Sequence, residues 1–317
     1  MQQIAIVVAL LLALETPVLG SEAPPGWAYP VNPPGLKPAP DDGSPRHVPD
    51  SGAAFTLTQI RDLNFAPDWH PDDHPPMPDI VARGRKPGVL ACGSCHRAGG
   101  SGGPENARLA GLPAAYIVQQ MADFKSGART TSVPERAPPK LMVSTAKAIN
   151  DQEIEAAAAY FSALQPRAAI RVVAAENVPK TEVTGWHLAI AADQQTEPLG
   201  QRIVEVPENP EYFELRDGRA RFVAYVPPGS VQRGQALVAS GSSKTVACGI
   251  CHGPDLKGLG PIPGIAGRSP SYVVRQLYDF KTGARAGDWS ALMKPVIENL
   301  SADDMISLAA YAASLSP

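Results

Sequence analysis

The four cysteines of the chain could do the most specific chemistry. They form two motifs of identical spacing, each followed by a histidine: Cys92-Gly93-Ser94-Cys95-His96 and Cys248-Gly249-Ile250-Cys251-His252. C-x-x-C-H is typical of covalent haem c attachment, because two thiols at this spacing match the two vinyl groups of one haem. The histidine that follows can lie under the iron as its proximal ligand. The sequence therefore predicts two covalently attached haem c groups.

Three other interpretations of the cysteine pairs compete with haem attachment. An exported protein could pair them as disulfides, a thioredoxin-like fold could use one pair for redox exchange, and a zinc site could use all four. None of these sites requires a histidine after each pair. Two such motifs with no cysteine left over favour haem.

The chain is an internal repeat. The two cysteine motifs lie 156 residues apart (248 − 92), and at the same offset the segment 111–129 matches 267–285 at ten of nineteen positions. The offset then falls from 156 to 151 within a Pro-rich loop between Arg129 and Met142, and residues 140–164 match residues 291–315. The sequence therefore predicts two copies of one module of about 75–90 residues.

Two methionines coincide when the copies are superimposed. Met142 and Met293 each lie about eight residues before the last helix expected in their module, which predicts a thioether on a loop opposite the proximal histidine. The competing interpretation is a core methionine that fills a gap, which is the role we expect for Met121 and Met305. The second ring N–H of each proximal histidine needs a carbonyl partner, and the segments that start at Ala107 and Pro263 could supply it.

Each copy is expected to be mostly helical. Apolar residues recur at helical spacing over 113–125 and 269–281, and shorter helices are expected over 79–85 and 230–239. The last helix of each copy should begin after an N-cap residue and end near residue 164 or 315. Those N-caps are Asn150 and Ser301.

The ends and the linker of the chain have a different character. Residues 1–20 indicate an export signal, because the apolar stretch Ile4 to Leu14 is too short to span a bilayer and small or apolar residues precede Ser21. Residues 21–87 form a Pro-rich extension, 88–166 the first module, 167–229 an insertion with short strands, and 230–317 the second module. Expected strands of the insertion are 170–173, 187–190, 202–206 and 221–226.

Composition excludes some partners and leaves two local hypotheses open. The net charge is −3, which disfavours nucleic acid. The run Asp68 to His74 could be a metal cluster, although a solvated or docking loop explains it as well. His187 is an alternative haem ligand, against the more usual structural role of a lone histidine.

At this point the chain resembles the bacterial tandem di-haem c-type cytochromes. The likeness rests on C-x-x-C-H, the helix motif Y-x-x-x-Q-(L/M)-x-D-F-(K/R)-x-G-x-R, the ligand methionine and the acidic-capped last helix ending A-A-Y-x-x-S-L. It implies a mainly α fold with two class I cytochrome c domains in tandem, with iron bound by His96 and Met142 in one module and His252 and Met293 in the other.

The resemblance also implies an electron carrier rather than an enzyme. Its expected setting is the periplasm, as a soluble or loosely membrane-attached protein. Its expected redox partners are a dehydrogenase or quinol-linked donor and an acceptor such as an oxidase or another cytochrome. Two alternatives remain: a dedicated cytochrome subunit of a larger dehydrogenase, and a di-haem peroxidase, which would need an open iron.

Overall fold

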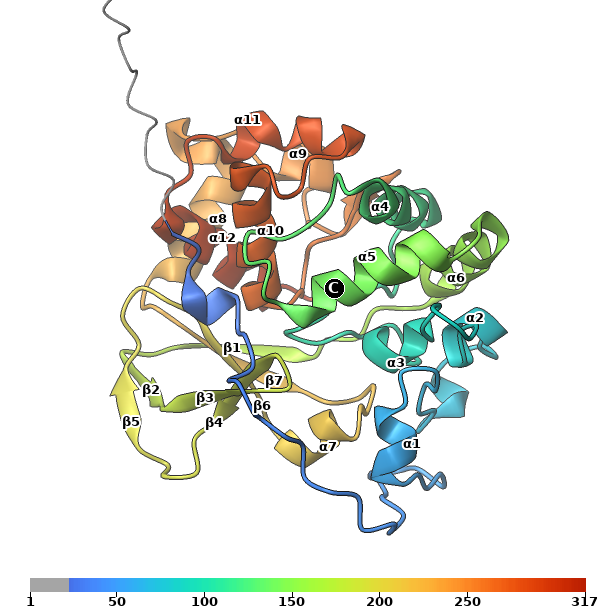
Figure 1. Ribbon diagram of the computed structural model, residues 1–317. Helices are drawn as coiled ribbons and strands as arrows, with labels where there is room; N and C mark the ends of the chain where they lie inside the picture. Colours follow the sequence, from blue (N-terminus) through green and yellow to red (C-terminus); the bar gives the residue numbers. More distant parts are fainter. Residues whose placement is uncertain (1–22) are drawn as a thin grey trace, which may run out of the picture.

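The computed structural model describes residues 23–317, so the expected export signal lies outside the described residues. Along the described chain, a run of helices is followed by a run of short strands and then by a second run of helices (Figure 1). The helices are α1 (Leu57–Arg61), α2 (Asp79–Ala82), α3 (Cys92–His96), α4 (Ala114–Ser126), α5 (Ala137–Ala148), α6 (Asp151–Ala163), α7 (Pro210–Glu214), α8 (Ser230–Ser240), α9 (Gly249–His252), α10 (Pro270–Thr282), α11 (Lys294–Ile297) and α12 (Ala302–Ser314). The strands are β1 (Ile170–Ala174), β2 (Asn177–Pro179), β3 (Thr181–Thr184), β4 (His187–Ile190), β5 (Thr196–Pro198), β6 (Val204–Pro207), β7 (Phe222–Val226), β8 (Gly258–Leu259) and β9 (Ile262–Pro263).

The first module is built from α2 to α6. Helix α4 packs against both α5 and α6, and α2 packs against α3 and α6. Their apolar faces meet in one core that includes Val81, Ile117 and Phe161. Helix α6 starts as the sequence predicts: the Asn150 side chain accepts from the backbone N–H of Glu153, whose side chain reaches back to Asn150.

The second module repeats this arrangement with α8 to α12. Helices α8 and α12 cross closely, and α10 packs against α12. A Cβ built on Gly234 of α8 would lie 2.0 Å from the carbonyl oxygen of Ser307 on α12, so only glycine allows this approach. Ser301 caps α12 through the same reciprocal bonds that Asn150 makes in the first module, which confirms both predicted N-caps.

The insertion contains the predicted strands. Strand β7 is central in a three-stranded sheet, parallel to β1 and antiparallel to β6. Strands β3 and β4 form a hairpin, and β2 pairs with β5. Helix α7 lies between β6 and β7 and has no counterpart in our sequence analysis. Because α12 packs on β1 and β7, the sheet is attached to the second module.

The Pro-rich extension is not extended throughout. It contains α1, and its first described turn packs into the core of the second module through Ala28 and Tyr29. The Tyr29 hydroxyl donates to the Asp279 carboxylate over 2.8 Å, and Arg275 of α10 donates to the Ala28 carbonyl. The extension therefore fastens the start of the described chain to α10.

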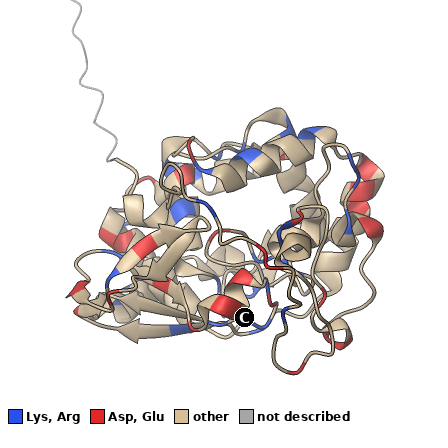
Figure 2. Cartoon of the chain, turned by 60° about the horizontal axis from the view of Figure 1, so that its bottom comes forward, with Lys and Arg blue, Asp and Glu red and all other residues tan. Residues whose placement is uncertain are grey.

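Charges are mixed over the molecule. Figure 2 shows basic and acidic residues interspersed along the ribbon rather than gathered by sign. Within residues 23–317, no helix combines the length and the apolar character needed to cross a membrane.

Candidate haem sites and the interface between the modules

Both cysteine motifs fold as a single helical turn that ends at the histidine. In the first, His96 Nδ1 lies 2.8 Å from the carbonyl oxygen of Ala107, and in the second, His252 Nδ1 lies 2.8 Å from that of Pro263. A carbonyl only accepts, so each Nδ1 carries the proton and each Nε2 keeps its lone pair for a metal. This confirms the carbonyl partners expected from the sequence.

Burial favours the neutral form of both histidines. It lowers the pKa of His96 and of His252, which favours the neutral imidazole that a metal needs. Burial also raises the pKa of Cys92 to about 12. The first sulfur of the motif therefore lies in an apolar environment, as a group that joins a porphyrin edge should.

A cleft brings the first motif and Met142 together. It is lined by Cys92, Cys95, His96 and Met142. The rest of its lining is mainly aliphatic. Two thiols, an oriented imidazole and a thioether in one apolar cleft are the donor set that haem c requires.

A second cleft continues from the first toward the other module. It is lined by His96 and Met142 together with Arg129 and Arg136. Arg136 is buried, and its Nη2 has no hydrogen-bond partner among the described residues. A buried guanidinium nitrogen without a partner suits a carboxylate, and haem carries two propionate carboxylates, so this cleft also fits the group.

The sequence led us to expect Met142 on a loop, but Met142 lies inside α5. The Pro-rich stretch before it does not break that helix, because Pro138 occupies its first turn, where a backbone N–H has no intrahelical partner. Met121 of α4, expected to be core only, lines the same cleft while packing against the core. The first module thus presents two thioethers to one cleft.

In the second module, Met293 lies between the 3₁₀ turn Asp288–Leu292 and α11. Cys248 and Met293 both pack at the edge of the second core. The Thr245 hydroxyl donates to the Val296 carbonyl, which joins the segment before the cysteine motif to the helix that follows Met293. These contacts keep the methionine segment and the cysteine segment in one part of the module.

A reciprocal polar network joins the modules. Arg129 donates to Gln120 of its own module and to Tyr272 and Gln276 of the other. Arg285 does the same with the copies exchanged, donating to Gln276, Tyr116 and Gln120. Backbone bonds from Thr130 to Ala284 and from Ala286 to Ala128 add to the contact. The sequence signal was present, because Tyr, Gln and Arg are among the residues identical in both copies.

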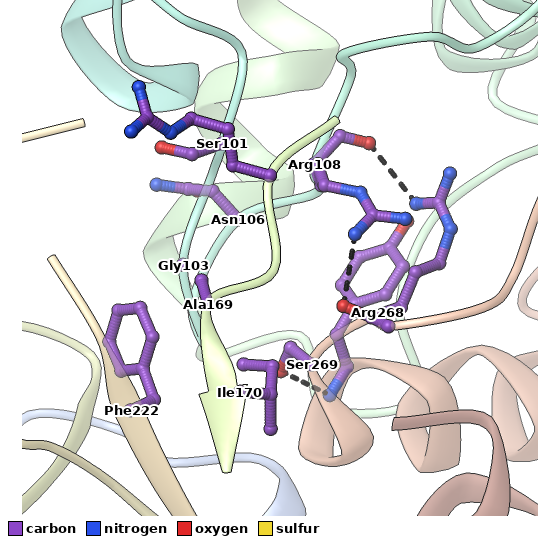
Figure 3. Close-up of a pocket in the computed structure, with 12 residues that line it drawn as sticks. Ser101, Gly103, Asn106, Arg108, Ala169, Ile170, Phe222, Arg268 and Ser269 are labelled. Atoms are coloured by element: carbon purple, nitrogen blue, oxygen red, sulfur yellow. Dashed lines mark hydrogen bonds between the residues drawn. The ribbon is translucent and has the colours of Figure 1, made fainter. Parts of the chain in front are cut away.

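A second reciprocal pair lies beside this network. Arg108 donates to the carbonyls of Ala266 and Gly267. Arg268 donates back to the carbonyl of Arg108 (Figure 3). Arg108 directly follows Ala107, and Arg268 lies five residues after Pro263. Ala107 and Pro263 supply the carbonyls that face the two histidines. The two modules therefore meet next to the segments that orient their histidines.

Two hypotheses about other histidines are not supported. His187 packs its ring 4.3 Å from that of Phe213, and it lines neither cleft at the first cysteine motif. His70 pairs with Asp217 at 3.1 Å and His74 with Asp68 at 3.2 Å. Within residues 23–317, no group of three or more His, Cys, Asp or Glu side chains could hold a metal ion. The alternative hypothesis of a metal cluster at Asp68 to His74 is therefore wrong, which leaves the solvated or docking loop.

Comparison with known proteins agrees with this geometry. The cytochrome c family matches residues 81–165. A thiosulfate dehydrogenase electron acceptor from Thiomonas intermedia (strain K12) is 29% identical over 66% of this chain and 71% of its own length. A cytochrome c4 from Azotobacter vinelandii is 28% identical over 70% of this chain and 83% of its own.

One solved structure extends the likeness to most of the chain. A thiosulfate dehydrogenase from Marichromatium purpuratum is 27% identical with a TM-score of 0.50, and the match covers 82% of this chain. This chain spans 40% of that longer one. With the two motifs, the repeated module and these relatives in hand, the chain is a tandem di-haem c-type cytochrome, an electron carrier with two covalently bound haem c groups.

Proposed function

We propose that the two cysteine motifs and the two methionines in register hold the two haems. Cys92 and Cys95 form the thioether links of the first haem, with His96 as proximal and Met142 as distal ligand. In the second module the corresponding residues are Cys248, Cys251, His252 and Met293. The observation that carries this assignment is the single apolar cleft lined by the first motif and Met142.

Bound haem supplies one-electron chemistry, and the chain controls its surroundings. The carbonyls of Ala107 and Pro263 fix the orientation of the two imidazoles. Thioether ligation by a methionine favours the reduced iron and raises its potential. Side chains such as Ile117 and Phe161 keep water out of the first cleft. With a histidine and a methionine both bound to it, the iron would have no free position for a substrate.

We propose that the chain accepts electrons in the periplasm from a dehydrogenase that oxidises a small sulfur oxyanion, thiosulfate, and passes them to an oxidase or another cytochrome. The support is the likeness to two thiosulfate dehydrogenase electron acceptors and to the solved structure of a thiosulfate dehydrogenase. The export signal expected over residues 1–20 supports the compartment. Relatives named cytochrome c4 share similar identity, so the electron-carrier role is broader than this donor.

The donor is tested by mixing oxidised holoprotein with a purified thiosulfate dehydrogenase and thiosulfate in a stopped-flow spectrometer. We expect reduction of both haems at a rate that rises with the concentration of this chain. Thiosulfate alone should leave the spectrum oxidised. Absence of enzyme-dependent reduction, in a sample that dithionite reduces fully, would exclude this donor while leaving the carrier role in place.

A dedicated subunit of a larger dehydrogenase remains the second candidate. It would use the extension and the insertion as binding surfaces for the catalytic subunit. Much of both segments is instead occupied internally, because Tyr29 packs on α10 and the insertion sheet packs on α12. Purification of the exported chain alone, with full haem content, would favour the free carrier over the subunit.

A further inference from the structure

The turn between β3 and β4 holds a bulky residue in a conformation that such residues rarely adopt. Thr184 pairs with His187, so Gly185 and Trp186 are the two central residues of a tight hairpin. Both have positive φ angles, 52° and 66°. Turns of this kind favour asparagine or glycine, and a tryptophan in the left-handed region is an outlier. A strained tryptophan at this turn indicates that its side chain does more than form the turn.

Contacts from two directions hold the turn in place. The backbone N–H of Trp186 donates to the side-chain oxygen of Asn32 over 2.8 Å, which ties the turn to the Pro-rich extension. On the other side, the ring centroids of His187 and Phe213 of α7 are 4.3 Å apart. Neither Asn32 nor Phe213 lines the cleft at the first cysteine motif. The position of Trp186 is therefore set by the extension and the insertion, and not by the contents of that cleft.

Trp186 contributes to the wall of the first cleft. Among the described residues that line this cleft, Trp186 alone comes from outside the first module, and it lies there with both cysteines of the motif and Met142. The insertion also contacts the motif itself, because the Arg216 guanidinium donates to the carbonyl of Ser94, which lies between the two cysteines. The insertion thus brings an aromatic side chain to the site expected to hold the first haem.

An indole at this place would change the surroundings of the haem. Oxidised iron carries one more positive charge than reduced iron, and an apolar environment without water disfavours the more highly charged state. A large apolar ring in the wall of the cleft takes space that water would otherwise fill. Trp186 should therefore favour the reduced state of the haem that it faces.

We propose that Trp186 is the cover of the first haem, by which the insertion excludes water from this cleft and raises the reduction potential of that haem. Trp186 neither ligates the iron nor carries a titratable group, so its effect is on the haem environment alone. This inference rests on the proposed function, in which the first cysteine motif and Met142 hold the first haem.

The test is a potentiometric titration of the Trp186→Gly holoprotein. Glycine adopts positive φ without strain, so the hairpin should still form. At a fixed ambient potential we expect the ratio of reduced to oxidised iron to fall about tenfold at the first haem, a shift of about 59 mV for one electron, and to stay unchanged at the second. NMR signals of the ligand methionine methyl groups, assigned with Met142→Ala, follow the two haems separately. Trp186→Phe keeps an apolar ring and should retain most of the wild-type potential.

Gln194→Gly is the matched control. Gln194 lies in the next turn of the insertion, between β4 and β5, and is exposed. It also has a positive φ, 52°, and it does not line the first cleft. This substitution therefore makes the same backbone change away from the haem and should leave both potentials unchanged.

Unchanged potentials in Trp186→Gly, equal shifts at both haems, or the same shift in Gln194→Gly would overturn the proposal. A potential as low in Trp186→Phe as in Trp186→Gly would also overturn it, because an apolar ring would then not be the cause. Two haems per chain and a methionine–iron band at full intensity in each variant show that the haem ligands are in place. Failure of the cover is thereby distinct from failure of the haem assignment.

Discussion

At the scale of single residues, the question is which methionine sulfur would bind each haem iron. The first cleft contains two thioethers, those of Met142 on α5 and Met121 on α4. When the two modules are superimposed, Met142 coincides with Met293, whereas Met121 coincides with Leu277. The repeat therefore favours Met142 over Met121 as the proposed ligand, a choice that the cleft alone does not make.

Met142→Ala should halve the far-red band that reports methionine–iron ligation, because one of two haems loses its thioether. The matched control is Met121→Leu, which keeps an apolar side chain of similar size and should leave the band at full intensity. Absorption spectra of the oxidised holoproteins check both. Loss of the band in Met121→Leu and its retention in Met142→Ala would reverse the assignment.

A second residue-scale feature is the buried carboxyl of Glu205 on β6. It is 1% exposed, and its Oε2 accepts hydrogen bonds from the Ser269 hydroxyl and from both the backbone N–H and hydroxyl of Ser271 at the start of α10. Its Oε1 has no partner among the described residues. Desolvation outweighs these hydrogen bonds and raises the pKa of Glu205 above its ordinary value of 4.5.

This raised pKa predicts a pH dependence of stability. The folded state holds the Glu205 proton more tightly than the unfolded state does, so the bound proton stabilises the fold. This contribution to the free energy of unfolding is fully present below about pH 4.5 and is lost as the pH rises through the pKa of Glu205 in the folded state. Glu205→Gln should remove that loss, giving a smaller fall in the free energy of unfolding between pH 4.5 and 8 in urea titrations. Exposed Glu182→Gln should keep the wild-type slope, and an unchanged slope in Glu205→Gln would refute the argument.

At the scale of elements, the closest helix contact is the crossing of α8 and α12. Gly234 permits it, because any Cβ there would overlap the carbonyl of Ser307. In an open helix Gly→Ala stabilises by about 1 kcal/mol. At this crossing the helices would have to separate, and overpacking costs about 1–3 kcal/mol.

Gly234→Ala should therefore lower the free energy of unfolding by about 2 kcal/mol, against the helix propensity of alanine. Gln235→Ala, the exposed neighbour on the same helix, should change it by less than about 0.5 kcal/mol. Urea unfolding of the two holoproteins measures both effects. A Gly234→Ala chain as stable as wild type would mean that α8 and α12 do not cross at this residue.

Local elements could be predicted from the sequence because their signals are local. Asn150 and Ser301 sit next to acidic first turns, and the expected helix over 230–239 corresponds to α8 within one residue. The expected strands correspond to β1, β4, β6 and β7. The predicted loop position of Met142 was wrong because a Pro-rich stretch usually indicates a loop, whereas Pro138 lies in the first turn of α5, where proline is tolerated.

At the scale of the whole molecule, what the sequence could not provide is long-range packing. Helix α7 is only five residues long and has no strong periodicity, yet its Phe213 ring packs beside Gly103, in the loop that follows the first motif. The contacts of Arg129 and Arg285 span the two copies and depend on how the modules face each other. The repeat revealed which residues are shared, and only the assembled structure shows what they touch.

The same packing explains why two similar modules are unequal. In each module a backbone carbonyl oxygen lies 2.8 Å from Nδ1 of the motif histidine, so the two histidines are oriented in the same way. The insertion then covers one motif and leaves the other exposed at Ile250. A single chain thereby combines an enclosed site and an accessible one, joined through a polar interface of arginines, tyrosines and glutamines.

The central claim, two closed haem sites in an electron carrier, is tested most directly by the absorption spectrum of the exported protein, oxidised and reduced, with a haem count after denaturation. The account predicts two covalent haems per chain, the methionine–iron band at two-haem intensity, and no response to peroxide or carbon monoxide. One haem, a missing band or a prompt change on adding either reagent would reveal an open iron and contradict it.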